Sequence, residues 1–248
     1  TDNYDEFAQA CNDFHAVGTK QSDEELRAAY SELMNRRLCN FLSSMRLFLD
    51  HIESRLKRTS GKNSVAVQEF KRRSSDVYDT VFAYRFAYKL RNYSQHFGDP
   101  IWGVGFSSSV PDQSDEVSFS ASTTFDTYGL LVTGGDCWGP LRKELEAMPR
   151  HVDVAGIMQE VPDALFSIWA AFLDVQYDRI QGIHLLVSEM LDVEGAVPGT
   201  VILGEWVDND GSVALSYQQP PLDVLELVDG FLKARPPANP GFEQNAAR

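Results

Sequence analysis

The stretch RTSGKN, residues 58–63, separates two long helical patterns and decides how the chain folds. Gly61 and Asn63 favour a turn there, because these residue types tolerate the backbone conformations that end a helix. Apolar residues recur every three or four positions over residues 22–57, and the same spacing runs over residues 64–97. Two long helices joined by so short a loop must lie antiparallel.

The segments around this helix pair mix strand and helix signals. β-branched, aromatic and serine residues predict strands at 101–110 and 116–125 around a turn at 111–115, and residues 128–135 read as a third strand. Residues 208–211, DNDG, predict a hairpin between strands at 200–207 and 212–217. Helical spacing predicts further helices at residues 4–16, 139–148, 163–191 and 220–234.

These elements predict an α+β fold that is mainly α. We expect an antiparallel bundle of long helices with a small inserted antiparallel β-sheet, because the strands fall between helices of the bundle. A single domain is expected over residues 1–235, followed by a mobile proline-containing tail at 236–248. Division into two domains near residue 98 is the alternative.

The charge of the chain is unevenly distributed. The net charge is −14, yet residues 36–91 hold 13 Lys or Arg against five acids and carry +8, which leaves −22 for the rest. Such asymmetry is typical of one basic surface on an acidic protein. A basic helix pair that docks on acidic neighbours within the chain explains it equally well.

Other sequence features narrow the classes of function. Cys11, Cys39 and Cys137 are odd in number and lack metal-binding spacing, so neutral unpaired thiols in a reducing cytoplasm are expected. No apolar run reaches membrane-spanning length, and the acidic start is unlike a secretory signal. No nucleotide-binding, metal-binding or nucleophile motif is present, so no metal and no cofactor is predicted.

The constellation that carries chemistry is RNYSQH, residues 91–96, at the end of the second helical pattern. Asn92 and His96 lie one turn apart on one face, whereas Arg91 and His96 differ by roughly 140° around an ideal helix. Either the helix loosens toward Gly98, or a second protomer supplies the same motif across a two-fold axis.

This set suits cleavage of RNA without a metal. The 2′-hydroxyl can attack the adjacent phosphate when a base removes its proton and an acid protonates the leaving oxygen. Histidine, with an ordinary pKa near 6.5, serves either role. The arginine fork can hold the phosphate oxygens, and an amide can orient either partner. One histidine per chain supplies only an acid or only a base, so a symmetric dimer would supply both.

An arginine followed by Asn and then by His after four residues, near the end of a long bundle helix, resembles the R-x4-6-H motif of the HEPN superfamily. The resemblance covers residues 22–100 and extends to the helix at 163–191. It implies a helical bundle, a homodimer whose two motifs share a cleft, and metal-independent endoribonuclease activity that leaves 2′,3′-cyclic phosphate ends. It also implies a role in a toxin–antitoxin or phage-defence system, with Arg91 and His96 catalytic and Asn92 in support.

The basic residues of the helix pair would then guide the RNA backbone, with Arg72, Arg73, Arg85 and Lys89 as the contacts. One feature departs from part of the family. Some members carry a tyrosine two residues after the histidine, where an antitoxin attaches nucleotides, and this chain has Gly98 there. A partner protein or antitoxin would therefore act in another way.

Two other functions fit the sequence. The first is a non-catalytic helical interaction module that binds a partner protein, in which Arg91 pairs with an acid and His96 caps the helix end. The second is a small-molecule binder with a pocket between sheet and bundle, lined by Trp102, Trp138, Trp169 or Trp206.

Overall fold

The computed structural model describes residues 2–12, 23–109, 118–191, 207–209, 212–214 and 222–234. These residues are mostly helical and include one three-stranded and one two-stranded sheet, which confirms the mainly helical α+β class. The chain divides into two compact units, Thr1–Phe172 and Leu173–Arg248, and each is described by itself. The single domain over 1–235 stays a prediction, and the tail at 236–248 lies outside the described residues.

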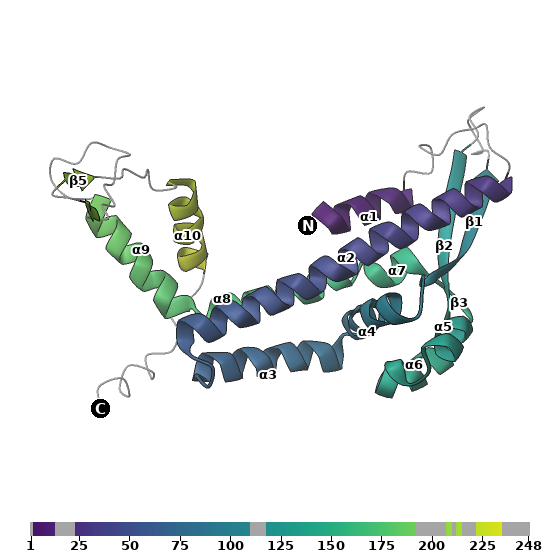
Figure 1. Ribbon diagram of the computed structural model, residues 1–248, viewed down its shortest axis with the longest axis horizontal. Coiled ribbons are helices and arrows are strands. Elements are labelled where there is room, and N and C mark those ends of the chain that lie inside the picture. The colour runs from purple at the N-terminus through teal and green to yellow at the C-terminus, as the bar shows by residue number, and fades with distance from the viewer. Residues whose placement is uncertain are drawn as a thin grey trace. The chain divides into compact units, whose positions relative to one another are not determined.

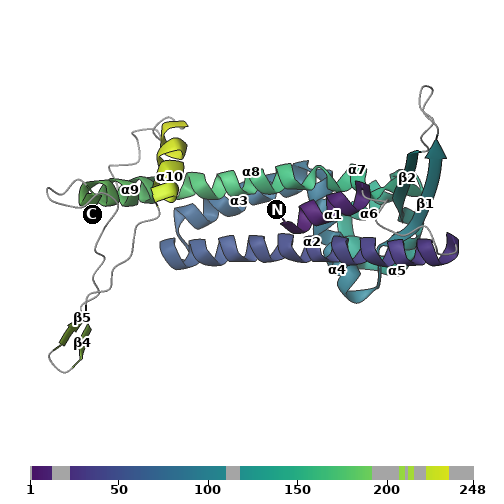
Figure 2. The same cartoon turned by 90° about the horizontal axis from the view of Figure 1, so that it is seen from above.

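The predicted turn after the first long helix is confirmed. Helix α2 (Asp23–Ser60) ends before Gly61, whose φ of 87° is costly for any residue with a Cβ. Helix α3 (Val65–Thr80) begins after Ser64, whose hydroxyl accepts a hydrogen bond from the Val67 amide at 3.3 Å. The two helices therefore run antiparallel, as Figures 1 and 2 show, with strands β1 and β2 at the N-terminal end of α2.

Helix α2 buries one continuous stripe. Its fully buried residues recur every three or four positions, as an amphipathic helix requires. They are Tyr30, Met34, Leu38, Phe41, Leu42, Met45, Ile52 and Leu56. Helix α1 (Asp2–Asn12) packs on this stripe.

Rings of α1 and α8 (Val161–Val175) complete the helical core of the first unit. Phe7 of α1 stacks on Phe41 of α2 with ring centroids 6.3 Å apart. From α8, Trp169 lies 6.0 Å from the Phe48 ring, and Phe172 meets Phe70 of α3 edge to face at 6.5 Å.

The prediction of one continuous helix over 64–97 is wrong in one respect, because the helix breaks at Val81. Val81 is extended (φ −104°, ψ 106°), so α3 ends at Thr80 and α4 runs from Phe82 to His96. Arg85 stabilises the break, since its guanidinium donates to the carbonyls of Tyr78 at 2.8 Å and Asp79 at 2.7 Å. These contacts satisfy acceptors that a helix end would otherwise leave open.

The predicted strands at 101–110 and 116–125 form β1 (Ile101–Ser109) and β2 (Ser118–Asp126), which pair antiparallel. The third strand is β3 (His151–Asp153), on the other side of β2. The strand predicted at 128–135 is wrong, because Thr127–Gly134 forms helix α5. Its buried residues, Thr127, Leu130, Leu131 and Gly134, follow the helical spacing of three and four rather than alternation.

Short helices follow α5 and lead into α8. The 3₁₀ segment η2 (Gly135–Leu141) precedes α6 (Arg142–Ala147), which confirms the helix predicted at 139–148 in part. Helix α7 (Val154–Met158) follows β3, and the Asp153 carboxylate caps it by accepting from the Gly156 amide at 2.6 Å.

A buried amide joins the sheet to the helices. Asn35 of α2 is 5% exposed, and its side chain bonds to the backbone of Ile101 at the start of β1. The Ile101 amide donates to Asn35 Oδ1 at 2.9 Å, and Asn35 Nδ2 donates to the Ile101 carbonyl at 3.2 Å. The pair of bonds imitates one more rung of the sheet, so α2 fixes where β1 begins.

The three cysteines are unpaired and half-buried. Burial raises the pKa of each thiol, and the pKa of Cys11 reaches about 11. Neutral, unreactive thiols follow from this, in agreement with the prediction.

In the second unit, the helix predicted over 163–191 divides near Gln176, and α9 runs from Tyr177 to Leu191. The Gln176 backbone amide donates to the Leu173 carbonyl at 3.2 Å. This bond spans three residues, as in a 3₁₀-helix, rather than the four of an α-helix. Strands β4 (Val207–Asn209) and β5 (Ser212–Ala214) form the predicted hairpin, whose outer residues 200–206 and 215–217 lie outside the description. Helix α10 (Leu222–Ala234) packs on α9.

Within the described residues, no helix is both long enough and apolar enough to cross a bilayer.

Replacing Asn35 by alanine should lower the free energy of unfolding by about 2–4 kcal/mol, because it leaves a buried amide and a buried carbonyl of Ile101 unsatisfied. Urea titration followed by circular dichroism measures this loss. Asn40→Ala, an exposed site on the same helix, is the matched control and should change stability by less than about 0.5 kcal/mol. Equal effects of the two changes would contradict the role of Asn35.

Stability should fall as pH rises from about 10 to about 12. Burial raises the pKa of Tyr30 to about 12 from 10.0, so the folded state disfavours the ionised phenol. This contribution is fully present below pH 10 and is lost as the pH approaches the folded-state pKa. Thermal unfolding across this range measures the effect.

Tyr30→Phe separates ionisation from packing. The variant loses the hydrogen bond from the hydroxyl to the Ala10 carbonyl, 2.8 Å long, and should be about 1 kcal/mol less stable at pH 8. Its alkaline decline should be shallower than that of the parent protein. An identical decline in both proteins would show that Tyr30 does not titrate in this range.

Candidate functional site

Trp138 holds the buried face of α4. Its indole is fully buried and stacks on Phe86 at 5.9 Å and on Tyr93 at 5.6 Å, two helical turns apart on one side of α4. Its Nε1 donates to the Leu130 carbonyl at 2.8 Å. Gly134 makes room for the ring, since a Cβ there would lie 2.5 Å from the indole nitrogen. The orientation of α4 is therefore set by its aromatic face.

Within RNYSQH, Tyr93 belongs to this buried face, whereas an ideal helix places Asn92 roughly 100° and Arg91 roughly 160° away from it. His96 is exposed, and Asn92 and Arg91 are half-buried. The Phe97 amide donates to the Tyr93 carbonyl at 2.8 Å, so α4 remains regular through His96 and the loosening toward Gly98 does not occur before the histidine. An ideal helix separates Arg91 from His96 by roughly 140°, so one α4 does not bring their side chains to a common point.

Arg91 and Asn92 form the polar part of the motif. Arg91 Nη1 donates to Asn92 Oδ1 at 3.4 Å, a long hydrogen bond. Arg91 Nε is buried and has no hydrogen-bond partner within the described residues. The His96 ring meets Phe97 edge to face at 6.5 Å. The guanidinium of Arg91 therefore keeps a hydrogen-bond donor that no described residue uses.

Three of the four predicted RNA contacts are engaged with acids of this chain. Arg72 pairs with Glu69 at 2.8 Å and with Asp76 at 2.7 Å, and Arg73 pairs with Glu69 at 2.8 Å. These two arginines hold the pKa of the Glu69 carboxyl at about 2.

Arg85 and Lys89 lie next to residues of α6 and η2, whereas Arg72 and Arg73 pair with acids of their own helix, α3. Arg85 pairs with Glu144 at 2.7 Å in addition to its contacts at the α3–α4 break. Lys89 is half-buried near Cys137 and Gly139 of η2. Arg72 and Arg73 lie on α3, whereas Arg85, Lys89 and the motif lie on α4.

A cavity of about 330 Å³ opens at the end of α4, between α2, α4, α5 and β1. Phe97 and Trp102 line it and are exposed to 44% and 66%. Among the other predicted tryptophans, Trp138 is core, Trp169 packs on Phe48 and Phe172, and Trp206 lies outside the described residues.

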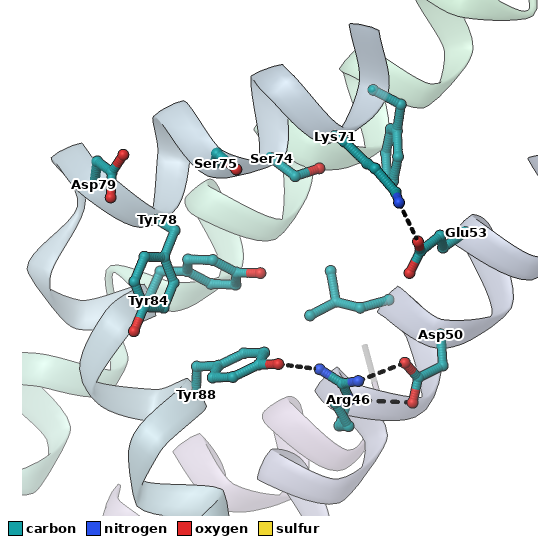
Figure 3. Close-up of a pocket in the computed structure, with 12 residues that line it drawn as sticks. Arg46, Asp50, Glu53, Lys71, Ser74, Ser75, Tyr78, Asp79, Tyr84 and Tyr88 are labelled. Carbon is teal, nitrogen blue, oxygen red and sulfur yellow. Dashed lines mark hydrogen bonds and ion pairs between the residues drawn. The ribbon is translucent and has the colours of Figure 1, made fainter. Parts of the chain in front are cut away.

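A larger groove of about 480 Å³ lies between α2, α3 and α4, and the sequence did not point to it. Figure 3 shows Arg46, Asp50 and Tyr88 on one side of this groove and Ser74 with Lys71 on the other. The Arg46 guanidinium holds Asp50 through contacts of 2.9 and 3.1 Å, donates to the Tyr88 hydroxyl and lies 5.2 Å from the centre of that ring.

Aromatic rings form the inner wall of this groove. Tyr78 meets Tyr84 edge to face at 6.2 Å and Tyr88 at 5.8 Å. Burial raises the pKa of Tyr84 and of Tyr78, so both phenols stay protonated at neutral pH. Glu53, which lies beside Lys71 on the rim, has a lowered pKa, mainly because Lys57 donates a hydrogen bond to it. Its carboxyl therefore stays ionised.

No sequence signal could have revealed the groove. Its walls meet only because the chain bends at Val81, and neither glycine nor proline marks that bend. Comparison of the chain with protein-family models, with curated proteins and with solved structures finds no match. Any function of the site must therefore be inferred from its residues and their geometry alone.

Proposed function

We propose that the protein is a metal-independent endoribonuclease of the HEPN type, acting as a homodimer in a cytoplasmic toxin–antitoxin or phage-defence system. The observation that carries the proposal is the end of α4. An exposed His96 lies one turn after Asn92, and the adjacent Arg91 has a buried Nε without a partner in the described part of the chain. The HEPN-like bundle is part of the same proposal, supported by the long antiparallel helix pair that leads to the motif.

The chemistry follows from two copies of this motif. One His96 imidazole removes the proton of the 2′-hydroxyl, whose oxygen attacks the phosphorus. The second His96, as imidazolium, gives its proton to the 5′-oxygen as the P–O5′ bond breaks. Arg91 stabilises the charge that develops on the phosphate oxygens, and Asn92 orients Arg91 through their hydrogen bond. The products are a 2′,3′-cyclic phosphate and a free 5′-hydroxyl.

The surface beside the motif suits a second copy of the chain. Phe97 and Trp102 form a patch, called here the Phe97/Trp102 patch, in which large apolar side chains are exposed next to His96. Exposed aromatic residues of this kind are enriched where proteins associate. Burial of this patch in a two-fold interface would bring two His96 side chains into one cleft.

A second function is favoured by one observation. Within the described residues, seven of the 13 basic residues over 36–91 pair with carboxylates, which leaves less free positive charge for a phosphate backbone than the sequence suggested. A non-catalytic interaction module that binds a partner protein accommodates this neutralised surface without further assumptions.

His96→Ala and Arg91→Ala should each lower the cleavage of a mixed single-stranded RNA pool in EDTA by at least about 100-fold, because each removes a proton-transfer or charge-stabilising group. Gel analysis with end-group mapping measures the loss and identifies 2′,3′-cyclic phosphates. Gln95→Ala, an exposed neighbour on the same turn, is the matched control and should cleave like the parent protein. Equal cleavage by all four proteins would place the activity elsewhere, and no cleavage by any would favour the interaction module.

The protein should sediment as a dimer, and the double change Phe97→Ser and Trp102→Ser should shift it toward monomer and reduce cleavage in parallel, because the second protomer completes the site. Phe166→Ser is the control, since Phe166 is 70% exposed on α8, a helix that carries no part of the motif. Sedimentation equilibrium over a concentration series measures the association. A parent protein that is monomeric but active would contradict the shared site.

A further inference from the structure

The groove between α2, α3 and α4 contains an unsatisfied polar group. Ser74 Oγ is buried, lines the groove and has no hydrogen-bond partner within the described residues. A buried hydroxyl without a partner is costly, so such groups in native proteins usually meet a ligand or water. The volume of about 480 Å³ lies in the range typical of small-molecule sites.

The charges around the groove select against a phosphate inside it. Arg46 and Lys71 face three carboxylates, those of Asp50, Glu53 and Asp79, which gives a net charge of −1. Arg46 is already held by Asp50, and Lys71 lies 3.5 Å from Glu53. An anion entering the groove would have to displace these pairs and would meet the surplus carboxylate.

A cation is also disfavoured. One face of the Tyr88 ring already carries the Arg46 guanidinium at 5.2 Å, so a second cation on that face would meet the charge of Arg46. A second cation in the groove would lie close to Arg46 and Lys71. What fits is an uncharged ligand with a flat body for the aromatic wall and polar edges for Ser74 and the phenols.

We propose that this groove binds one uncharged nucleobase of a single-stranded RNA, with the sugar and phosphate left outside it. This proposal rests on the proposed ribonuclease function and names the feature of the substrate that the protein would hold. Bases that are free of pairing are bound by proteins through stacking on aromatic side chains and hydrogen bonds to their edges.

The position of the groove relative to the motif agrees with this assignment. Tyr88 is half-buried on α4, three residues before Arg91 and four before Asn92, so about 6 Å of helix separates the groove wall from Asn92. Arg91, whose buried Nε has no partner in the described residues, is on the adjacent turn. A base held in the groove therefore lies within about one helical turn of Arg91 and Asn92, the residues proposed to act on the RNA.

Isothermal titration with the four ribonucleosides and their 5′-monophosphates tests the assignment without any need for cleavage. At least one nucleoside should bind with a dissociation constant on the order of 0.1 mM. Its monophosphate should bind no more tightly, and raising the salt concentration should change nucleoside affinity little, because no phosphate is neutralised in the groove. Tighter binding of every monophosphate, with steep salt dependence, would overturn the proposal.

Two variants place the binding in the groove. Ser74→Ala should weaken nucleoside binding by about tenfold, the effect of one hydrogen bond, without lowering the melting temperature, because its hydroxyl has no partner to lose within the described chain. Ser75→Trp, at the exposed rim, should fill the groove and abolish binding. Ser54→Ala, exposed on α2 and outside the groove, is the control and should bind like the parent protein.

The outcomes separate this proposal from the function on which it rests. Nucleoside binding that survives His96→Ala supports the groove whether or not RNA is cleaved. Cleavage in EDTA that is unchanged by Ser75→Trp, with no nucleoside binding, overturns the groove and leaves the ribonuclease standing. Binding of a basic or aromatic peptide in place of any nucleoside would also overturn it and would assign the groove to a protein partner.

Discussion

The stacking of Trp138 between Phe86 and Tyr93 is the constraint on which the rest of the site depends. It commits one side of α4 to the core, and the hydrogen bond from its indole to the Leu130 carbonyl ties the helix to α5. An ideal helix places Asn92 and Arg91 roughly 100° and 160° from Tyr93, so burying Phe86 and Tyr93 turns these two away from Trp138, while His96 is exposed at the last residue of α4. The placement of Arg91 and Asn92 is thus a consequence of core packing, and the exposure of His96 is a consequence of its position at the end of the helix.

The break at Val81 has an equally large effect on the electrostatics. It frees the carbonyls of Tyr78 and Asp79, and Arg85 turns inward to satisfy them. A residue that belongs to a basic stripe in a continuous helix therefore becomes a structural cap, which is also paired with Glu144. The same bend brings α3 and α4 together around the tyrosine-lined groove. One backbone conformation thus removes a charge from the surface and forms the groove.

Much of the fold follows from patterns that act locally. The apolar stripe of α2, the turn at Gly61 and the pairing of β1 with β2 were predictable, because helical spacing, a positive φ and alternation leave direct traces in sequence. Residues 128–135 were misassigned as a strand because a short apolar run fits both periods, and in the fold this run packs as a helix with Leu130 and Gly134 against Trp138. The motif was found from spacing alone. The pairing of Arg72, Arg73 and Arg85 was not, since it depends on side-chain placement across turns and helices.

The regularity of α4 has a further consequence for how the proposed enzyme would be controlled. A single helix keeps Arg91 and His96 on different sides, so one protomer holds half of the acid–base chemistry. Activity then depends on association, and it falls with dilution faster than the protein concentration does. A partner protein that covers the Phe97/Trp102 patch would silence the enzyme without touching Arg91, Asn92 or His96. In that case the two candidate functions, nuclease and interaction module, describe one surface: the patch that completes the site in a dimer is also the place where a partner can prevent it from forming.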